Sequence, residues 1–322
     1  MGPHAGTGAE KAPDGRVLDC LIAGGGPAGA TAAIYLARFR RSVTVIDAQE
    51  SRTRWIGTIR NYPGFPEGIS GPDLCDRIRR QASKHGAVFV KGHVRALHRT
   101  SSGFEALTSE GMILARHVIL ATGLKDRLPD VPGFSEQLIM RDKVRLCPIC
   151  DGHDFIGNRL AVWGEPSRAL REAVFLRTFT NQISIVPDRP LTSEDSHSLA
   201  SSGFDRVMDQ VTRISEDGEG VSLHFQNGDR RDFDAIYLAM GAAPRSDLAV
   251  TLGAAANKAG CLKTDDHRQT NVPGLYSIGD VVDELDQISV ATGHAAIAAT
   301  SVHNAIARAL GERPLTGRRE KA

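Results

Sequence analysis

The stretch VLDCLIAGGGPAGATAAIYLARFRRSVTVID, residues 17–47, decides the fold. The apolar run at 17–23 predicts a buried strand, and the Ala-rich segment 30–40 predicts a helix with one apolar face. Residues 42–47 predict a second strand that ends on an acid. A strand, a glycine-rich turn, a helix and a strand in this order are typical of a dinucleotide-binding unit. We therefore predict an α/β protein that holds a dinucleotide at residues 24–29.

Three glycines in the segment 24–29 have separate structural roles. Gly24 permits the tight turn, Gly26 lets the backbone approach a pyrophosphate, and Gly29 lets the helix pack closely on the strand. The start of the helix offers unpaired N–H groups and a positive dipole end to the anion. Asp47, roughly 20 residues further on, can accept a hydrogen bond from a ribose hydroxyl.

Bulk composition excludes several function classes. A chain of 322 residues is long for one domain, and 41% apolar with 24% charged residues is typical of a globular protein. The net charge of +1 argues against a nucleic-acid or anionic-membrane binder. No apolar run approaches the roughly 20 residues that span a bilayer. Residues 1–15 lack the apolar core of a signal peptide and predict a flexible leader, and five cysteines suit a reducing compartment, so we expect a cytoplasmic protein.

The segment RLCPICDGHDF, residues 145–155, carries two cysteines two residues apart. The pair can be half of a zinc site, a structural disulfide or a redox-active dithiol. Zinc needs four ligands, and His153 beside the pair gives only one tight cluster. Cys20 lies in an apolar strand as a small hydrophobe, while Cys75 and Cys261 stand alone. The pattern favours the redox dithiol, with a structural disulfide as the alternative.

Two later segments each run from a strand into a glycine turn. They are VILATGLKDRLPDVPG at 118–133 and TNVPGLYSIGDVVD at 270–283. Taken alone, each segment can be an ordinary connection from a strand into a turn without a binding role. The second ends in Gly279 and Asp280, which can aim a carboxylate and a helix N-terminus at a polyol or a phosphate.

Together these motifs resemble the low-molecular-weight thioredoxin reductase family. NYPGFP at 61–66, ATG at 121–123, CPICD at 147–151, GD at 279–280 and QISVATGHAAIAAT at 287–300 occur in that family's order. The resemblance covers nearly the whole chain after the leader. The C-x-x-C-D in mid-chain is its most specific element.

The resemblance implies two Rossmann-like, three-layer ββα domains, the second inserted in the first. Residues 16–126 and 241–322 would form the FAD domain, and 127–240 an NADPH-like domain carrying the cysteine pair. A homodimer would form through the FAD domains, partly through a helix from Gly293 to Leu310. The implied FAD contacts are Gly24, Gly26, Pro27, Ala28, Gly29, Asp47, Ala48, Asn61, Val94, Ala121, Thr122, Gly123, Gly279, Asp280, Gln287, Ile288 and Ser289.

The family's redox roles map onto three residues. By resemblance, Cys150 contacts the flavin and holds the thiolate, and Cys147 attacks the disulfide of a partner. Asp151 gives and takes protons for the thiolate leaving groups. A helix N-cap is the alternative role for Asp151. The implied partner is a thioredoxin-like protein or a small dithiol or disulfide.

The second nucleotide turn departs from the family. In RLAVWGEPSRALREAVFLR, 159–177, the strand and helix are present, but Glu165 and Pro166 stand where relatives have glycines. Glu165 brings a negative charge to the pyrophosphate position, and Pro166 removes an N–H. The next strand, ISIVPDRPLT at 183–192, is followed only by Arg189 instead of a basic run that holds a 2′-phosphate. We predict a damaged NADPH site.

Three other features add candidate roles. Arg168 and Arg171 are expected on a solvated helix surface. Trp55, in the altered segment, can stack on a flavin or anchor a loop over the FAD pocket. His294 and His303 are expected at a dimer interface or on the surface rather than in catalysis.

The damaged site resembles the pyridine-nucleotide-independent branches of the family. These are the ferredoxin-linked flavin thioredoxin reductases, the diflavin-linked disulfide oxidoreductases with a second FAD, and the oxygen-using dithiol oxidases. The sequence thus predicts an FAD-dependent thiol–disulfide oxidoreductase that uses NADPH poorly, with an unknown electron donor. A dithiol oxidase, an NADPH-dependent thioredoxin reductase with an unusual nucleotide site, and a non-enzymatic flavin sensor remain the alternatives.

Overall fold

The computed structural model describes residues 17–218 and 220–313, so the predicted leader at 1–15 lies outside the described residues. The chain divides into two compact units. Unit 1 comprises Met1–Thr53, Asp73–Leu124 and Pro244–Ala322, and unit 2 comprises Arg54–Pro72 and Lys125–Ala243. Each unit is described by itself.

Unit 1 is built on a sheet with β1 (Leu18–Ala23) between β2 (Val43–Asp47) and β6 (Gly111–Leu120), parallel to both. The long strand β6 also pairs with β17 and, in its first half, with the antiparallel strand β5. The remaining elements of unit 1 are η1 (Arg52–Trp55, which runs into unit 2), β3 (Val88–Lys91), β4 (Val94–Thr100), β5 (Gly103–Thr108), α7 (Asp247–Val250), β17 (Leu275–Ser277) and η3 (Gly279–Val281).

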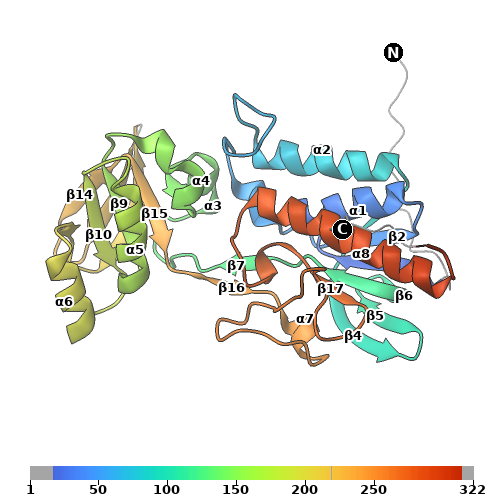
Figure 1. Ribbon diagram of the computed structural model, residues 1–322. Helices are drawn as coiled ribbons and strands as arrows, with labels where there is room; N and C mark the ends of the chain where they lie inside the picture. Colours follow the sequence, from blue (N-terminus) through green and yellow to red (C-terminus); the bar gives the residue numbers. More distant parts are fainter. Residues whose placement is uncertain (1–16, 219, 314–322) are drawn as a thin grey trace, which may run out of the picture. The chain divides into compact units, whose positions relative to one another are not determined.

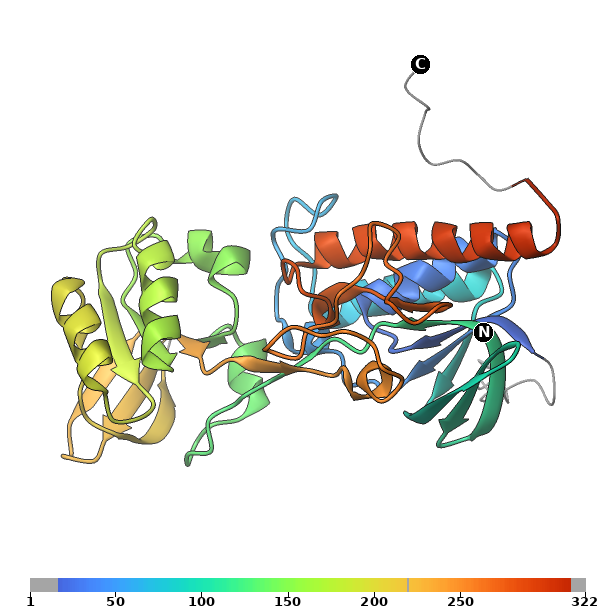
Figure 2. The ribbon, with the colours of Figure 1, turned by 60° about the horizontal axis from the view of Figure 1, so that its bottom comes forward.

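Three helices cover one face of this sheet: α1 (Pro27–Arg38), α2 (Gly71–Lys84) and α8 (Ile288–Ala309) (Figures 1 and 2). Helices α1 and α8 are rich in buried alanines, whose small side chains let the two helices pack closely. The apolar face of α8 is therefore largely used inside the chain, against α1. The predicted homodimer through this helix stays a prediction.

Unit 2 has three layers. Its parallel sheet runs in the order β11-β10-β9-β15-β8, and a separate antiparallel sheet runs β12-β13-β14. The elements are α3 (Glu136–Met140), β8 (Val144–Arg145), α4 (Pro148–Asp151), η2 (Gly152–Phe155), β9 (Leu160–Gly164), α5 (Pro166–Leu176), β10 (Ile183–Pro187), α6 (Ser193–Ser201), β11 (Asp205–Arg206), β12 (Val211–Asp217), β13 (Gly220–Phe225), β14 (Arg230–Phe233) and β15 (Ala235–Ala239).

Alternation along β9 explains the layers, because successive strand residues point to opposite faces. Leu160 and Val162 pack with α5 and α6, whereas Ala161 and Trp163 pack with the antiparallel sheet. The structure thus confirms the predicted α/β fold with Rossmann-like sheets.

Two short strands carry the chain from one unit to the other. They are β7 (Leu124–Asp126) and β16 (Ala242–Pro244), which pair with each other. The expected domain limits at 126/127 and 240/241 lie within three residues of the observed limits. The structure differs at Arg54–Pro72, which the sequence-based division kept with the first domain and which groups with unit 2. Trp55 explains this grouping, since its ring packs against the apolar core of unit 2.

Within residues 17–218 and 220–313, no helix combines the length and the apolar character needed to cross a membrane.

Candidate active site

The turn after β1 needs its glycines. Gly24 has a φ of +107°, and a Cβ there would lie 2.2 Å from the carbonyl oxygen of Ala121. A Cβ on Gly29 would lie 1.9 Å from the carbonyl oxygen of Gly24. Both contacts are with backbone, which cannot move aside as a side chain can. The two glycines therefore hold the end of β1, the first turn of α1 and the Ala121 segment together.

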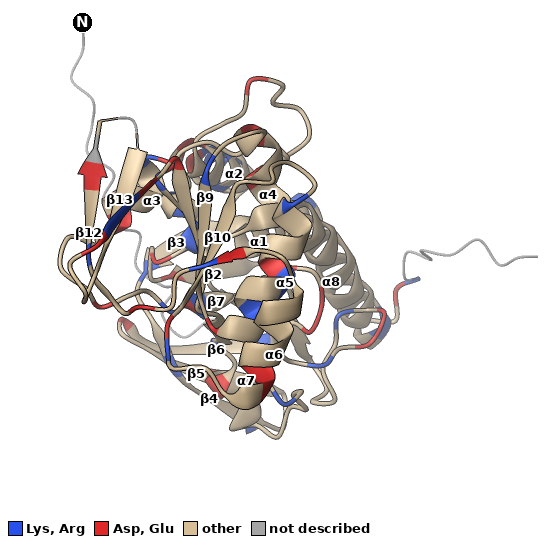
Figure 3. Cartoon of the chain, turned by 90° about the vertical axis from the view of Figure 1, so that its left-hand side faces the viewer, with Lys and Arg blue, Asp and Glu red and all other residues tan. Residues whose placement is uncertain are grey.

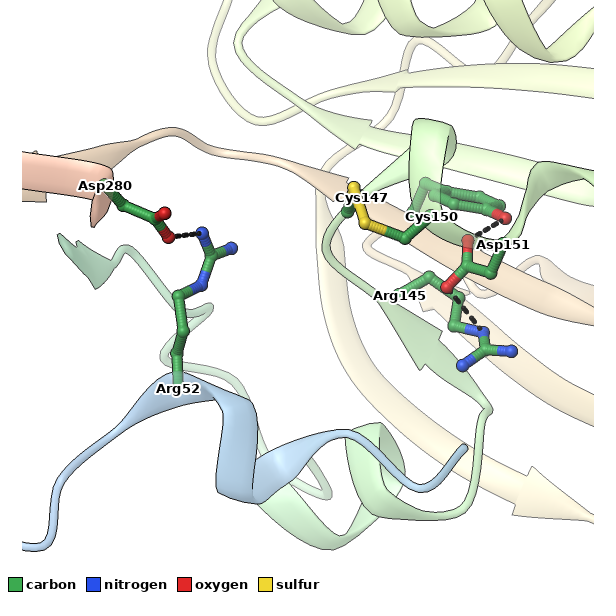
Figure 4. Close-up of a disulfide and its surroundings, with 7 residues drawn as sticks. Arg52, Arg145, Cys147, Cys150, Asp151 and Asp280 are labelled. Carbon is green, nitrogen blue, oxygen red and sulfur yellow. Dashed lines mark hydrogen bonds and ion pairs between the residues drawn. A yellow bond between two sulfur atoms is a disulfide. The ribbon is translucent and has the colours of Figure 1, made fainter. Parts of the chain in front are cut away.

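The Gly279–Asp280 segment joins the same place in unit 1. Gly279 has a φ of +71°, and a Cβ there would lie 3.0 Å from the Cβ of Ala28. The Asp280 carboxylate forms an ion pair with Arg52, with Oδ2 and Nη1 3.4 Å apart (Figure 4). Three predicted segments, 24–29, 121–123 and 279–280, thus converge. Arg52 was not among the predicted contacts.

The start of α1 fits the phosphates of a dinucleotide. Its N-cap residue is Gly26, which carries no side chain to cap the helix, and no acid occupies the first turn. The first N–H groups of a helix have no partner within the helix and favour an anion. This turn therefore fits the pyrophosphate of FAD.

The acid at the end of β2 lies where the pattern predicts it. Asp47 is buried, and its carboxylate accepts hydrogen bonds from the Gln49 N–H at 2.9 Å and from Arg79 Nη1 at 3.3 Å. Arg79 comes from α2, so the sequence pattern around Asp47 does not reveal this partner. Ala48 follows, half-buried.

The other predicted FAD contacts divide between the units. In unit 1, the Thr122 hydroxyl donates to the Arg245 carbonyl at 2.6 Å, and the Gly123 carbonyl accepts from the Arg245 N–H at 2.9 Å. Val94 begins β4 and packs against the core of unit 1. Gln287 is the N-cap residue of α8, followed by Ile288 and Ser289. Asn61 is exposed and belongs to unit 2. The assignment of all these residues to FAD stays a prediction.

Cys147 and Cys150 form a disulfide with their Cα atoms 5.4 Å apart (Figure 4). Cys147 is the N-cap residue of the one-turn helix α4, and Pro148 occupies its first position. Proline suits this position because the first N–H of a helix has no intrahelical partner. Both cysteines are half-buried, which keeps the disulfide within reach of a reactant.

The other cysteines differ in their surroundings. Cys20 is fully buried, and this burial raises the pKa of its thiol far above the ordinary value. Cys75 is also buried. Cys261 is half-buried, and burial raises its pKa as well. A raised pKa lowers the fraction of a thiol that is in the nucleophilic thiolate form, so Cys20 and Cys261 are less ready for disulfide exchange than a thiol with an ordinary pKa.

Asp151 is held by two side chains of unit 2. The Tyr237 hydroxyl donates to Oδ1 at 2.6 Å, and Arg145 Nε lies 3.3 Å from Oδ2 (Figure 4). Burial raises the pKa of Asp151 to about 6, against the opposing effects of Arg145 and of the Tyr237 hydrogen bond. The carboxyl group can therefore gain and lose a proton near neutral pH. Its side chain makes no capping hydrogen bond to η2, which argues against the N-cap alternative.

In the turn after β9, the Glu165 side chain caps the start of α5. Glu165 is the N-cap residue of α5, and its carboxylate accepts from the Ser167 N–H at 3.2 Å and the Arg168 N–H at 2.9 Å. Burial alone would raise the pKa of Glu165, but hydrogen bonds from Ser167, Arg168 and Arg189 lower it below its ordinary value. The carboxylate thus stays charged on the N–H groups that a pyrophosphate would use.

Arg189, the basic residue after β10, is engaged by acids. Its guanidinium lies 3.2 Å from Glu165 Oε1 and 2.8 Å from Asp195 Oδ2. Arg168 and Arg171 are exposed, as expected, and charged residues of both signs lie along α5 (Figure 3).

The two histidines of α8 have different environments. His294 is buried, and its Nε2 lies 2.9 Å from Glu284 Oε2, so the expectation of a surface position was wrong. The α8 pattern did not reveal this, because Glu284 precedes the helix. His303 is half-buried and accepts from Arg41 Nε at 3.1 Å through its Nδ1.

Comparison with known proteins agrees with this arrangement. Residues 18–295 match the family described as pyridine nucleotide-disulphide oxidoreductase. The thioredoxin reductase of Bacillus subtilis (strain 168) is 31% identical over 303 residues, which cover 90% of this chain and 95% of that protein.

Two solved structures extend the likeness to three dimensions. The thioredoxin reductase from Streptococcus pyogenes MGAS5005 has a TM-score of 0.81 at 30% identity, covering 91% of this chain and 99% of that chain. The structure of HlmI has a TM-score of 0.83 at 25% identity, covering 94% and 98%. The chain therefore belongs to the pyridine nucleotide-disulphide oxidoreductase family, in which it is a flavin-dependent disulfide oxidoreductase of the thioredoxin reductase type.

Proposed function

We propose that this protein moves two electrons between a bound FAD and a dithiol or disulfide partner through Cys147 and Cys150, and that NADPH is a poor electron donor. The partner is a thioredoxin-like protein or a small dithiol or disulfide; the relatives from Bacillus subtilis and Streptococcus pyogenes, named thioredoxin reductases, support the former. When bound, FAD supplies the two-electron exchange with the cysteine pair.

The chain's own residues handle binding and protons. The convergence of Gly24, Gly29, Ala121 and Gly279 supports a cofactor at the start of α1. In the exchange, the Cys147 thiolate attacks the partner disulfide, and the first partner thiolate leaves with a proton from Asp151. Asp151 then takes the proton of the Cys150 thiol, and the Cys150 thiolate attacks the Cys147 sulfur of the mixed disulfide. The second partner thiolate leaves with that proton from Asp151, so that one disulfide forms as one breaks.

The contacts of Glu165 carry the proposal about NADPH. The carboxylate accepts from two helix N–H groups and also pairs with Arg189, the basic residue that follows β10. A bound pyrophosphate would have to displace a charged group that is already hydrogen-bonded. We expect a loss of roughly 3 kcal/mol, about a hundredfold in affinity.

A second candidate is an NADPH-dependent thioredoxin reductase that tolerates this turn. The comparisons favour it, because the family description includes a pyridine nucleotide and the relatives are named plain thioredoxin reductases. A dithiol oxidase that passes electrons to oxygen is a third candidate. A second FAD at α5 would meet the same Glu165 carboxylate, so a count of flavins per chain tests that possibility.

Anaerobic stopped-flow mixing distinguishes these candidates. The oxidised holoenzyme is mixed separately with NADPH, NADH, reduced ferredoxin and a small dithiol, and flavin bleaching is followed, with dithionite as the positive control. We expect slow or absent bleaching with NADPH. Bleaching by NADPH at rates of about ten per second or faster, within the usual range of enzyme turnover, would establish the second candidate. Bleaching by the dithiol, reversed by oxygen, would favour the oxidase.

A further inference from the structure

Asp151 lies in a buried cluster of charged groups. The Arg145 side chain is 5% exposed and contacts three carboxylates: Asp142 at 2.7 Å, Asp151 at 3.3 Å and Asp154 at 4.0 Å. Arg60 contacts Asp154 from outside at 2.9 Å. A buried guanidinium needs such partners, because an unpaired buried charge is costly.

Tyr237 completes the cluster from the neighbouring strand. Arg145 on β8 and Tyr237 on β15 are paired residues on adjacent parallel strands, so both side chains lie on the same face. Tyr237 is fully buried, and its hydroxyl donates to Asp151 Oδ1. The two side chains therefore hold one oxygen each of the same carboxylate, 86 residues from Tyr237 along the chain.

The guanidinium of Arg145 is itself fixed in place. Its Cζ lies 5.1 Å from the centre of the Phe155 ring, and Asp142 binds its Nη1. Arg145 thus has little freedom to turn away from Asp151. This arrangement fixes both the direction of the carboxylate and its affinity for a proton.

We propose that Arg145 and Tyr237 are positioning residues that hold Asp151 as the proton carrier of the Cys147–Cys150 pair. The inference rests on the proposed role of that pair but not on the electron donor. Its test uses no NADPH, so its failure is distinguishable from failure of the donor proposal.

The step that depends on them is protonation of a leaving thiolate. The reduced pair and a disulfide RSSR give the Cys147–Cys150 disulfide and two RSH, so the two thiol protons end on the two RSH. An alkyl thiolate is a poor leaving group and needs the Asp151 proton as it departs. A nitrophenyl thiolate leaves readily without one.

The experiment compares two disulfides on the holoenzyme, whose cysteine pair is first reduced anaerobically by a phosphine. Hydroxyethyl disulfide requires the proton, and dithiobis-nitrobenzoate does not. The single-turnover rate with hydroxyethyl disulfide is divided by the rate with dithiobis-nitrobenzoate at each pH. Because both reactions need the Cys147 thiolate, this ratio cancels the ionisation of Cys147. What remains reports the protonation of Asp151 and its orientation.

Tyr237→Phe removes one hydroxyl and keeps the ring. Because the Tyr237 hydrogen bond and Arg145 both lower the pKa of Asp151, their loss raises it. We expect the midpoint of the ratio to move up by about one pH unit and its plateau to fall about tenfold. Arg145→Lys should shift the midpoint in the same direction but less, since it keeps the charge. Tyr276→Phe, which removes another buried tyrosine hydroxyl in unit 1, is the matched control and should leave the ratio unchanged.

Asp151→Asn separates positioning from general structural support. In that background the ratio should be low and independent of pH, and adding Tyr237→Phe should change it no further. The proposal is overturned if Tyr237→Phe leaves the midpoint in place, if it slows both disulfides equally, or if its effect persists beside Asp151→Asn.

Discussion

Two strand–turn–helix units, one in each half of the molecule, have the same order of elements but differ in the residue that caps the helix. In the turn from β1 to α1, a Cβ on Gly24 would lie 2.2 Å from the backbone oxygen of Ala121. In the turn from β9 to α5, a Cβ on Gly164 would lie 2.3 Å from the backbone carbon of Ala239. Both turns therefore need their first glycine for the same close approach of backbone.

The units differ in the residues that follow this glycine. Gly25 stands where the second turn has Glu165, and the N-cap residue of α1 is Gly26, which has no side chain to cap the helix. Glu165 is itself the N-cap residue of α5 and caps it with a carboxylate. A helix start that binds a phosphate and one that binds its own carboxylate satisfy the same N–H groups. The comparison teaches that two turns with the same close approach of backbone can begin one helix without a side-chain cap and the other with the chain's own carboxylate on its first N–H groups.

The largest expected effect follows from copying the second turn into the first. Gly25→Glu places a carboxylate beside the FAD turn, and its Cβ would lie 2.3 Å from Cγ of Asp47. We expect the affinity for FAD to fall more than about a hundredfold, giving colourless protein with native far-UV circular dichroism. The ratio of flavin to protein absorbance measures this. Glu165→Gly is the control and should keep its flavin; a fully yellow Gly25→Glu protein would contradict the comparison.

The reverse change should restore an anion site. Glu165→Gly with Pro166→Gly, combined with Pro187→Arg and Asp188→Arg, frees the N–H groups and adds positive charge for a 2′-phosphate. We expect the rate of flavin reduction by NADPH to rise about ten- to a hundredfold. Glu165→Gln removes the charge but keeps a capping oxygen, so it should give a smaller gain. If the variant with all four substitutions reduces its flavin with NADPH at the unchanged rate, the turn does not limit NADPH use.

Helix α5 holds a half-buried acid, Glu172, whereas α1 contains no acid, and this difference gives a pH-dependent prediction. Burial raises the pKa of Glu172 on α5 to about 7, against the opposing charges of Arg168 and Arg171. The proton on Glu172 stabilises the fold fully below about pH 4.5, and this stability is lost as pH rises through about 7. Glu172→Gln should therefore raise the free energy of unfolding by about 2 kcal/mol at pH 8 and by little at pH 4.

Urea denaturation at both pH values measures the effect of Glu172→Gln. Glu194→Gln, at an exposed acid on α6, is the matched control and should show no such difference. Equal changes at the two pH values would mean that the charge of Glu172 does not matter.

The smallest expected effect concerns the cap itself. Glu165→Ala removes the side chain that accepts from the Ser167 and Arg168 N–H groups, and it should cost about 1 kcal/mol of stability. Gly26→Ala, at the N-cap of α1, removes no capping side chain, so the apoprotein with this change should lose less stability than Glu165→Ala does. Thermal unfolding of the two flavin-free variants measures both losses. A Glu165→Ala protein that unfolds at the same temperature as the unchanged protein would show that the cap contributes nothing to stability.

Local patterns were enough for much of the fold and the site. The glycines of the first turn, the alternation of the strands and the C-x-x-C-D motif each depend on neighbours in sequence, so residues 17–47 and 147–151 were interpretable without coordinates. The departure of the second turn was visible for the same reason, since Glu165 and Pro166 break a local pattern.

Contacts between distant segments required the tertiary structure. The sequence predicted that Glu165 would repel a phosphate, but only the folded turn shows its carboxylate on the N–H groups of α5 and beside Arg189. The burial of His294 against Glu284 and the grouping of Arg54–Pro72 with unit 2 likewise depend on packing.

Asp151 shows the division most clearly. Its place after Cys150 is local, and its expected role as a proton carrier came from the resemblance of the C-x-x-C-D motif to the thioredoxin reductase family. Its partner Tyr237 is not local, since it lies 86 residues away. Arg145 is close in sequence, but it comes beside Tyr237 because β8 pairs with β15. Strand pairing in a sheet is set by the burial of whole faces rather than by any local pattern, so only the tertiary structure decided which side chains hold the carboxylate.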